Sequence, residues 1–302
     1  MGKTTSERPA DLPSDPIDLT TGGGITMSER PADLPDYRNP PVAEVVFGLN
    51  YACDEPFLAP HIGLYWQLIK EDFPDIQHHP PLDPQVEDLS REVRESGRTV
   101  QIISGAPPLP RCWFVDTAGN TLIQLQPDRF IGNWRKITGD EAYPRFEKLR
   151  DAFLSRWLQF GTFAEGIGLG SPIIKQAELT YVNHIPQGTC WQEMSDVSKV
   201  ISPLDGLGRT RFLQHLESLQ CFLHYRLPDD SGRLHVAIDP VVRRDGDETQ
   251  IVLRVKLTAR GPVAGETEDA VKDWFTLARE WIVRGFTDLT SDEAHAEWER
   301  VT

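Results

Sequence analysis

The segment 124–136, QLQPDRFIGNWRK, carries polar residues where a plain strand would need only aliphatic ones, so it is either the wall of a site or the solvent face of a sheet. After Pro127 the segment alternates between apolar and polar residues, which is typical of a β-strand with one buried face. One face carries Arg129, Asn133 and Arg135, whose guanidinium and amide groups donate hydrogen bonds to anions. The opposite face carries the side chains that would pack inward, namely Phe130, Gly132 and Trp134. The pattern predicts a strand whose arginines point toward a ligand or toward another part of the chain.

A second segment, ELTYVNH, begins at Glu178 and has polar residues on both strand faces. Glu178 would point to one face and Asn183 to the other, which indicates a strand that lines a cavity or contacts another part of the chain. Pairing of Glu178 with Arg129 or Arg135 is the favoured interpretation, because buried polar groups usually satisfy one another. The alternative is a cleft in which the two arginines hold an anionic substrate and Glu178 or His184 moves protons.

A basic surface is expected on the later strands. If the segment DDSG forms a turn, His224, Arg226 and His235 fall on one face of a strand pair. Arg254 and Lys256 alternate with aliphatic residues in the next strand. Such a face could receive an acidic protein partner or a small anionic ligand, whereas the plain solvent face of an antiparallel sheet is the favoured alternative.

Motifs for metal-dependent or nucleophilic catalysis do not occur in the sequence. Cys221 and His224 could form half of a zinc site, but residues i and i+3 of a strand point to opposite faces. The segment GIGLG at 166–170 follows a predicted helix, so it fits a helix C-terminal linker better than a phosphate loop. No HExxH, GxSxG or PCxxC motif is present. We therefore expect no metal site and no cofactor.

The composition narrows the classes of partner. The 302-residue chain has 46 acidic and 31 basic residues and a formal net charge of -15. This charge repels a phosphate backbone, so nucleic-acid binding is disfavoured. No apolar run is long enough to span a membrane, and the N-terminus lacks the apolar core of a signal peptide. The 4 cysteines form no CxxC pair, which indicates free thiols and a cytoplasmic location.

The elements that position these residues follow from hydrophobic periodicity. Residues 1–36 are rich in Pro, Asp, Ser, Thr and Gly, contain SERPADLP twice and are expected to form a disordered tail. A strand near 43–51, a helix over 61–73 and a proline-rich loop, HHPPLDP, follow. Strands are then expected over 99–104, 111–116, 120–126 and 129–136. A helix begins near Pro144 and carries a stripe of aromatic residues that includes Phe146, Phe153, Trp157 and Phe160.

The same order of elements is expected again in the second part of the chain. It comprises a strand at 176–185, a short helix at 209–218, strands at 219–227, 233–240 and 250–260, and a long helix at 267–286. The spacing of large apolar residues is similar in the two long helices, which indicates an internal duplication. The sequence thus predicts an α+β fold of two similar halves, 37–165 and 171–302. Each half would be an antiparallel sheet covered by a long helix with an aromatic stripe.

Several motifs together resemble a family of sporadically distributed prokaryotic proteins of unknown function. They are NPPVAEVVFGLNY, RCWFVDTAGNTLIQLQPDRFIGNWRK, YPRFEKLRDAF, ELTYVNHI and DWFTLAREWIVRGFTDLT. The resemblance spans about Asn39 to Trp298, and no single motif is diagnostic. It implies a soluble intracellular protein whose family has no established activity, cofactor or catalytic residues.

These observations favour a non-catalytic binding or accessory protein, with a protein partner or a small anionic ligand. The patchy distribution that the resemblance implies suits a mobile defence, toxin-neutralising or peptide-modification system. The alternative is an enzyme that acts on a small anionic substrate in a groove between the two halves.

Overall fold

A computed structural model of the protein describes residues 31–83, 86–90, 108–206, 212–213, 215–245, 248–265 and 267–302. Its large compact unit runs from Leu34 to Thr302. The last residues of the predicted tail belong to this unit, since Leu34 is buried and the Asp36 carboxylate pairs with Arg145 at 2.9 Å. The rest of the predicted tail up to residue 30, and the predicted strand at 99–104, lie outside the described residues.

The described residues form a mixed α+β fold, which confirms the predicted class. The first part of the chain contains β1 (Val42–Ala52), α1 (Ala59–Ile69), β2 (Asp75–His79), β3 (Arg111–Val115), β4 (Thr121–Gln126), β5 (Arg129–Arg135) and α2 (Phe146–Gly166). The second part contains β6 (Ile173–Pro186), α3 (Val197–Val200), β7 (Cys221–Arg226), β8 (Arg233–Asp245), β9 (Glu248–Gly261), α4 (Glu268–Leu289) and α5 (Asp292–Glu297).

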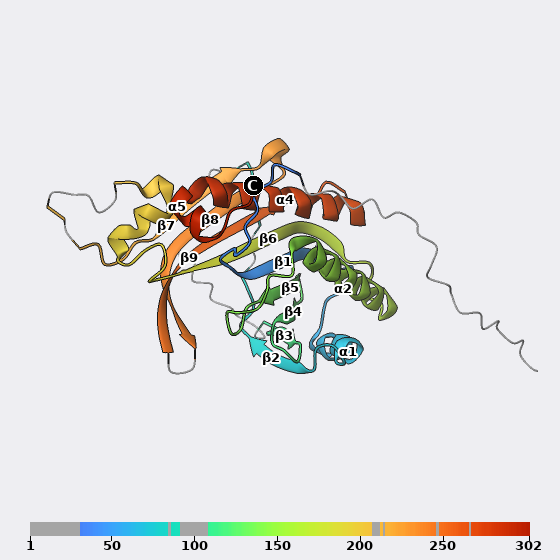
Figure 1. The fold of residues 1–302 in the computed structure, drawn as a ribbon. Helices are drawn as coiled ribbons and strands as arrows, with labels where there is room; N and C mark the ends of the chain where they lie inside the picture. The colour runs from blue at the N-terminus through green and yellow to red at the C-terminus, as the bar shows by residue number, and fades with distance from the viewer. Residues whose placement is uncertain are drawn as a thin grey trace, which may run out of the picture. The chain divides into compact units, whose positions relative to one another are not determined.

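Within the described residues, all the strands belong to one 9-stranded sheet in the order β2-β3-β4-β5-β1-β6-β9-β8-β7. Each neighbouring pair is antiparallel. Figure 1 shows this order from β2 at the bottom to β8 near the top. The strands of both predicted halves join because β1 pairs with β6, for example Phe47 with Leu179.

Two local predictions are wrong. The segment HHPPLDP was expected to be a loop from its start, yet His78 and His79 lie in β2, which pairs with β3. Because β2 is an exposed edge strand, it has no alternation of apolar residues that could signal it. The described part of 209–218 is not helical. Its Phe212 is 90% exposed, and a short helix without a buried face is only marginally stable.

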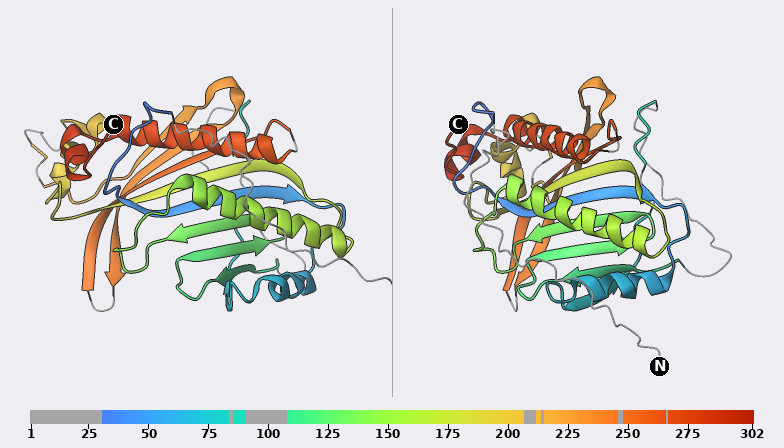
Figure 2. Two further views of the ribbon diagram at one scale, coloured as in Figure 1. Left: turned by 45° about the vertical axis from the view of Figure 1, so that its right-hand side comes forward. Right: turned by 90° about the vertical axis from the view of Figure 1, so that its right-hand side faces the viewer.

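The long helices cover one face of the sheet. Figure 2 shows α2 and α4 side by side across the same face, with α1 beside α2. Phe47 of β1 lies under both long helices, with its ring centroid 5.5 Å from that of Phe153 in α2 and 5.2 Å from that of Phe275 in α4. Tyr65 of α1 packs edge-on against Phe130 of β5 on the same side. Alternate residues of these strands therefore form the hydrophobic core.

Gly132 of β5 allows α2 to approach the sheet closely. A Cβ atom at Gly132 would lie 2.7 Å from Cδ2 of Phe153, well inside van der Waals contact. The missing side chain thus makes room for the Phe153 ring between Phe47 and Phe130, whose centroids are 5.5 and 5.8 Å away.

Candidate functional site

The face of the sheet opposite α2 and α4 carries the polar residues of the central strands, and we call it the open face. On β5, the residues between Phe130, Gly132 and Trp134 point to this face, since successive strand residues alternate. The structure therefore places Arg129, Asn133 and Arg135 on the open face. Their partners in β1 are Asn50, Val46 and Glu44.

The candidates on the later strands lie on the same face, with one exception. Glu178 pairs with Arg260 across β6 and β9, and the register places Lys256 opposite Val182 and Arg254 opposite His184. In the β7–β8 pair, His224 lies opposite His235 and Arg226 opposite Arg233. The exception is Asn183, which is buried on the helix side and donates a hydrogen bond to the carbonyl oxygen of Val255 at 3.1 Å.

A half-open pocket of about 220 Å³ lies on the open face over β4, β5, β1, β6 and β9. Four of the predicted site residues line it, namely Arg129, Asn133, Glu178 and Lys256. Sequence reasoning did not select several other polar groups in its wall, which include Glu44, Arg111, Gln124 and Thr180. The pocket thus joins side chains from both parts of the chain.

Arg129 is a buried cation whose hydrogen bonds are incomplete. It is 5% exposed, and its Nη2 donates to the carbonyl oxygen of Asp83 at 2.8 Å. Its Nε has no hydrogen-bond partner among the described residues. Burial lowers the pKa of Arg129, as does Arg260, while nearby carboxylates such as Glu178 raise it. One N–H of this guanidinium therefore lacks an acceptor among the described residues.

Arg111 of β3 is likewise an arginine whose hydrogen bonds are incomplete. Its Nη1 donates to Oε1 of Gln124 at 2.8 Å, whereas its buried Nε is unpaired within the described part of the chain. Burial, together with the charge of Arg129, lowers the pKa of Arg111. The charge of Arg129 acts on Arg111 because the two guanidinium groups lie near each other in the pocket wall.

A hydrogen-bonded chain of side chains orients Glu44 at the pocket. Gln124 Nε2 donates to Asn133 Oδ1 at 2.7 Å, and Asn133 Nδ2 donates to Glu44 Oε1 at 2.6 Å. Burial raises the pKa of Glu44, although the hydrogen bond from Asn133 and the charges of Arg135 and Lys256 oppose the shift. Asn133 therefore holds a carboxyl group in place.

The predicted partner of Glu178 is wrong. Its Oε2 accepts a hydrogen bond from Arg260 Nε at 2.6 Å, rather than from Arg129 or Arg135. Arg260 is directly opposite Glu178 on β9, so the register itself brings this pair together. Arg135 instead donates its Nε to the carbonyl oxygen of Gly119 at 3.1 Å.

His184 and Arg254 lie outside the wall of this pocket. Burial lowers the pKa of His184, and the charges of Arg243 and Arg254 lower it further. Arg254 binds Asp239 through two hydrogen bonds, with Nε to Oδ1 at 3.0 Å and Nη2 to Oδ2 at 2.7 Å. Proton transfer by His184 beside Arg129 therefore has no support from the pocket geometry.

The histidines and Arg233 meet at the β7–β8 end of the open face. His224 Nδ1 and His235 Nδ1 are 2.9 Å apart, and His235 Nε2 is 2.7 Å from Glu87 Oε2. Arg233 Nη1 donates to Glu87 Oε1 at 2.5 Å. Burial alone would raise the pKa of Glu87, but the hydrogen bonds from His235 and Arg233 outweigh it and lower the pKa to about 2. Glu87 is therefore ionised in this cluster at neutral pH.

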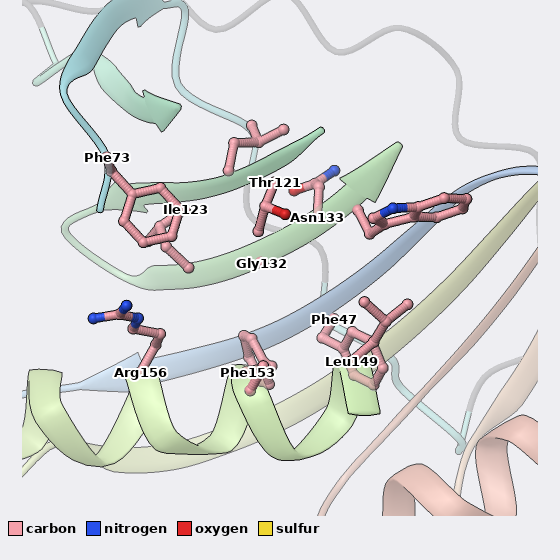
Figure 3. A pocket seen from close by; sticks show the side chains of 12 residues that line it. Phe47, Phe73, Thr121, Ile123, Gly132, Asn133, Leu149, Phe153 and Arg156 are labelled. Carbon is pink, nitrogen blue, oxygen red and sulfur yellow. The ribbon is translucent and has the colours of Figure 1, made fainter. Parts of the chain in front are cut away.

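A second pocket, of about 180 Å³, lies on the helix side between α2 and strands β4 and β5 (Figure 3). Its wall is mostly apolar, with Phe73 and Phe153 among the rings that line it. Arg156 contributes a charged group, but its guanidinium pairs with Asp72 and lies 5.2 Å from the centroid of the Phe73 ring. The polar chemistry of the molecule is thus concentrated on the open face.

No protein-family model matches the chain, and no curated protein matches it. No helix within the described ranges has the length and apolar character needed to cross a bilayer. The same residues contain no cluster of three or more His, Cys, Asp and Glu side chains suited to a metal ion. Cys53, Cys112, Cys190 and Cys221 are free thiols.

Proposed function

We propose that this protein is a non-catalytic binding or accessory protein and that its open-face pocket takes a small anionic ligand. The observation that carries the proposal is Arg129, a residue that is 5% exposed and whose Nε is unpaired within the described residues. Arg111 adds a second unpaired Nε in the same pocket wall. An anion between the two would supply the missing acceptors.

The size and polarity of the pocket favour a small ligand. About 220 Å³ accommodates a compact molecule rather than a folded partner. Glu44 and Glu178 in the same wall could accept hydrogen bonds from a hydroxyl or amino group of the ligand. The ligand class is therefore a small carboxylate or phosphate that also carries a hydrogen-bond donor.

Calorimetric titration of phosphate, citrate and glutamate into the full chain tests this function. We expect at least one of these anions to bind, and the Arg129→Gln variant to bind it roughly tenfold more weakly or worse, because a charge-assisted hydrogen bond is lost. Arg38→Gln is the matched control, since Arg38 is an exposed arginine outside the pocket.

Two outcomes would reject the proposal. One is the absence of binding of any of the three anions at millimolar concentration. The other is equal affinity in the wild type and in Arg129→Gln. If Arg129→Gln does not fold, Arg111→Gln takes its place, because it removes the other unpaired guanidinium from the same wall.

An enzyme acting on a small anionic substrate is the second candidate, and Glu44 favours it. A carboxyl group with a raised pKa, held beside cationic side chains, can transfer a proton to a bound molecule. Mass spectrometry of a bound anion after prolonged incubation distinguishes the two functions. A binding protein returns the anion unchanged, whereas an enzyme converts it and loses that conversion in the Glu44→Gln variant.

We propose that an internal duplication produced the two parts of the sheet that together form the pocket. The strands β5, β4, β3 and β2 lie on one side of the β1–β6 pair and β9, β8 and β7 on the other, so the three strands nearest the pair follow the same order on each side and β2 is additional. A long helix follows each set, α2 after β5 and α4 after β9. In an experimental structure, superposition of 42–166 on 173–289 must place β1 on β6 and α2 on α4. A superposition that fails to do so rejects the duplication.

The resemblance to sporadically distributed prokaryotic proteins supports a cytoplasmic accessory role. A mobile defence, toxin-neutralising or peptide-modification system is the setting that we propose. A pull-down from the native host should then recover a stoichiometric protein partner or small molecule, and recovery of neither would count against this setting.

A further inference from the structure

An acidic segment of the chain lies across the β7–β9 end of the open face. Residues 86–89, which we call the strap, belong to the connection between β2 and β3. The Glu87 side chain is 6% exposed and contacts Arg233 and His235. Arg260 Nη1 is 3.9 Å from the same carboxylate. The strap thus presents a buried carboxylate to a set of basic side chains.

The backbone of the strap is held by the same strands. Arg233 Nη1 donates to the carbonyl oxygen of Asp88 at 3.0 Å, and Arg226 Nη2 donates to that of Leu89 at 2.6 Å. We call Arg226, Arg233, His235 and Arg260 the basic cluster. It therefore recognises an extended peptide in two ways, through one carboxylate and through two successive carbonyl oxygens.

The strands position the basic cluster independently of the strap. Arg233 lies opposite both Arg226 on β7 and Arg260 on β9, and His235 lies opposite His224. These pairs are fixed by the sheet register, and alternation directs their side chains to the open face. The cluster is a preformed surface, whereas residues 86–88 have no regular secondary structure.

The strap makes polar contacts through Glu87, Asp88 and Leu89, and of its two apolar side chains Val86 is exposed and Leu89 is only partly buried. Val86, beside Glu87, is 80% exposed. A segment with little buried apolar surface opens at a lower free energy than a core strand. Its polar contacts can be reproduced by another peptide of the same chemistry.

We propose that the basic cluster is a docking site for an extended, glutamate-bearing segment of a partner protein, and that the strap occupies the site in the absence of the partner. Loss of Glu87 from the cluster leaves Arg233, whose side chain is 7% exposed, without the carboxylate that it shares with His235. A carboxylate from a partner segment would restore this ion pair. The overall charge of -15 opposes a general attraction to acidic partners, so the attraction has to come from this local cluster.

The strap competes at a high effective concentration because it is tethered. Short tethers correspond to roughly millimolar effective concentrations, so a peptide in trans must overcome this competition. Weakening the strap should therefore increase binding of an acidic peptide, which is the opposite of what loss of a purely structural ion pair would produce.

The experiment uses the full chain and a fluorescent peptide of residues 81–90, PLDPQVEDLS. In fluorescence anisotropy, we expect Glu87→Ala to bind this peptide at least about tenfold more tightly than the wild type, since the cis competitor is lost. The peptide PLDPQVQNLS, in which Gln and Asn replace Glu87 and Asp88, should bind Glu87→Ala at least about tenfold more weakly than the acidic peptide. Adding Arg233→Ala to Glu87→Ala should abolish this increase in affinity for the acidic peptide.

Matched variants separate the site from general charge effects. Glu280→Ala removes an acidic residue elsewhere, on α4, and should not increase peptide binding. Arg254→Ala removes an arginine from the same face but outside the basic cluster, and in the Glu87→Ala background it should leave the increase in peptide affinity intact. Arg129→Gln should also leave the increase in peptide affinity intact, because Arg129 lies outside the basic cluster. The peptide experiment therefore tests the docking site independently of the anion pocket.

The proposal is overturned if folded Glu87→Ala binds the acidic peptide no better than the wild type, or if Arg233→Ala does not reduce the binding. Circular dichroism verifies the fold of each variant. If Glu87→Ala is unfolded, Glu87→Gln replaces it. If that variant also fails, millimolar peptide added to the wild type must shift the NMR signals of the His235 ring, and the absence of a shift overturns the proposal.

Discussion

At the scale of single residues, burial decides what each charged side chain can do. Arg129 and Glu87 are both withdrawn from solvent, but their surroundings differ. Glu87 accepts hydrogen bonds from two basic residues, whereas Arg129 donates to a carbonyl oxygen and keeps an unpaired Nε within the described residues. The Glu87 carboxylate thus has hydrogen-bond partners within the fold, whereas one buried N–H of Arg129 lacks an acceptor among the described residues, and this is the group to which we propose that an anion binds.

The pKa of Glu87 makes the strap contact sensitive to acid. The folded state lowers this pKa from 4.5 to about 2, so the contact contributes stability above pH 4.5 and loses it as the pH falls toward 2. We expect Glu87→Gln to be less stable than the wild type at pH 7 by about 1–3 kcal/mol, and the difference to disappear near pH 2. Urea unfolding at several pH values measures it, with the exposed pair variant Glu280→Gln as control.

Glu44 should show the opposite pH dependence. Burial raises its pKa, so the folded state favours the neutral acid, and this stability is present below pH 4.5 and lost as the pH rises through the raised pKa. Glu44→Gln keeps an acceptor for Asn133 without the charge. We expect it to be more stable than the wild type at pH 7 and equally stable at pH 3. Thermal unfolding that shows a larger advantage at pH 3 contradicts the assignment.

The residues predicted from sequence differ in how far local pattern can place them. Alternation in β5 correctly placed Arg129, Asn133 and Arg135 on one face, because a strand fixes which neighbours share a face. It could not identify Arg260 as the partner of Glu178, since that depends on the β6–β9 register. Glu87 had no signal at all, because it lies in an irregular segment and meets its partners only through the tertiary fold.

At the scale of elements, periodicity predicted those with a buried face and failed for those without one. The helix expected from Thr267 starts there, and the Thr267 hydroxyl accepts a hydrogen bond from the backbone N–H of Ala270 at 3.2 Å. The exposed β2 was missed, and the helix expected at 209–218 does not form in its described residues. Hydrophobic alternation reports burial, so an element that buries little leaves little trace in the sequence.

The packing of α2 on β5 gives a prediction at this scale. Gly132→Ala places a methyl group 2.7 Å from Phe153 Cδ2, and this overpacking should lower the free energy of unfolding by about 1–3 kcal/mol. Gly63→Ala in α1 is the matched control, because its Cβ meets no atom within 4 Å. The control should be neutral or stabilising by up to about 1 kcal/mol. Chemical denaturation compares the two, and equal effects would contradict the packing argument.

At the scale of the whole molecule, the two long helices cover one face of the sheet, and the opposite face carries the polar side chains of the central strands. The helix side uses the apolar half of each strand, for example Phe47 and Leu179, as core. The remaining half carries arginines on β3, β5, β8 and β9 although the chain is acidic overall. Carboxylates on the same face pair with several of these arginines, such as Asp239 with Arg254 and Glu178 with Arg260. Arg111 and Arg129 differ in that each has an unpaired Nε within the described residues.

The compact unit begins at Leu34, so residues 34–37 should contribute to its stability. Leu34 is buried, and the Tyr37 hydroxyl lies 2.8 Å from Thr287 Oγ1 in α4, so residues 34–37 close the C-terminal end of the helix layer. A chain that starts at Leu34 should unfold at the same temperature as the full chain. A chain that starts at Arg38 should lose at least about 3 kcal/mol, because a buried leucine and a buried tyrosine are both removed. Calorimetry tests both, and an unchanged transition in the shorter chain would show that the compact unit begins after Tyr37.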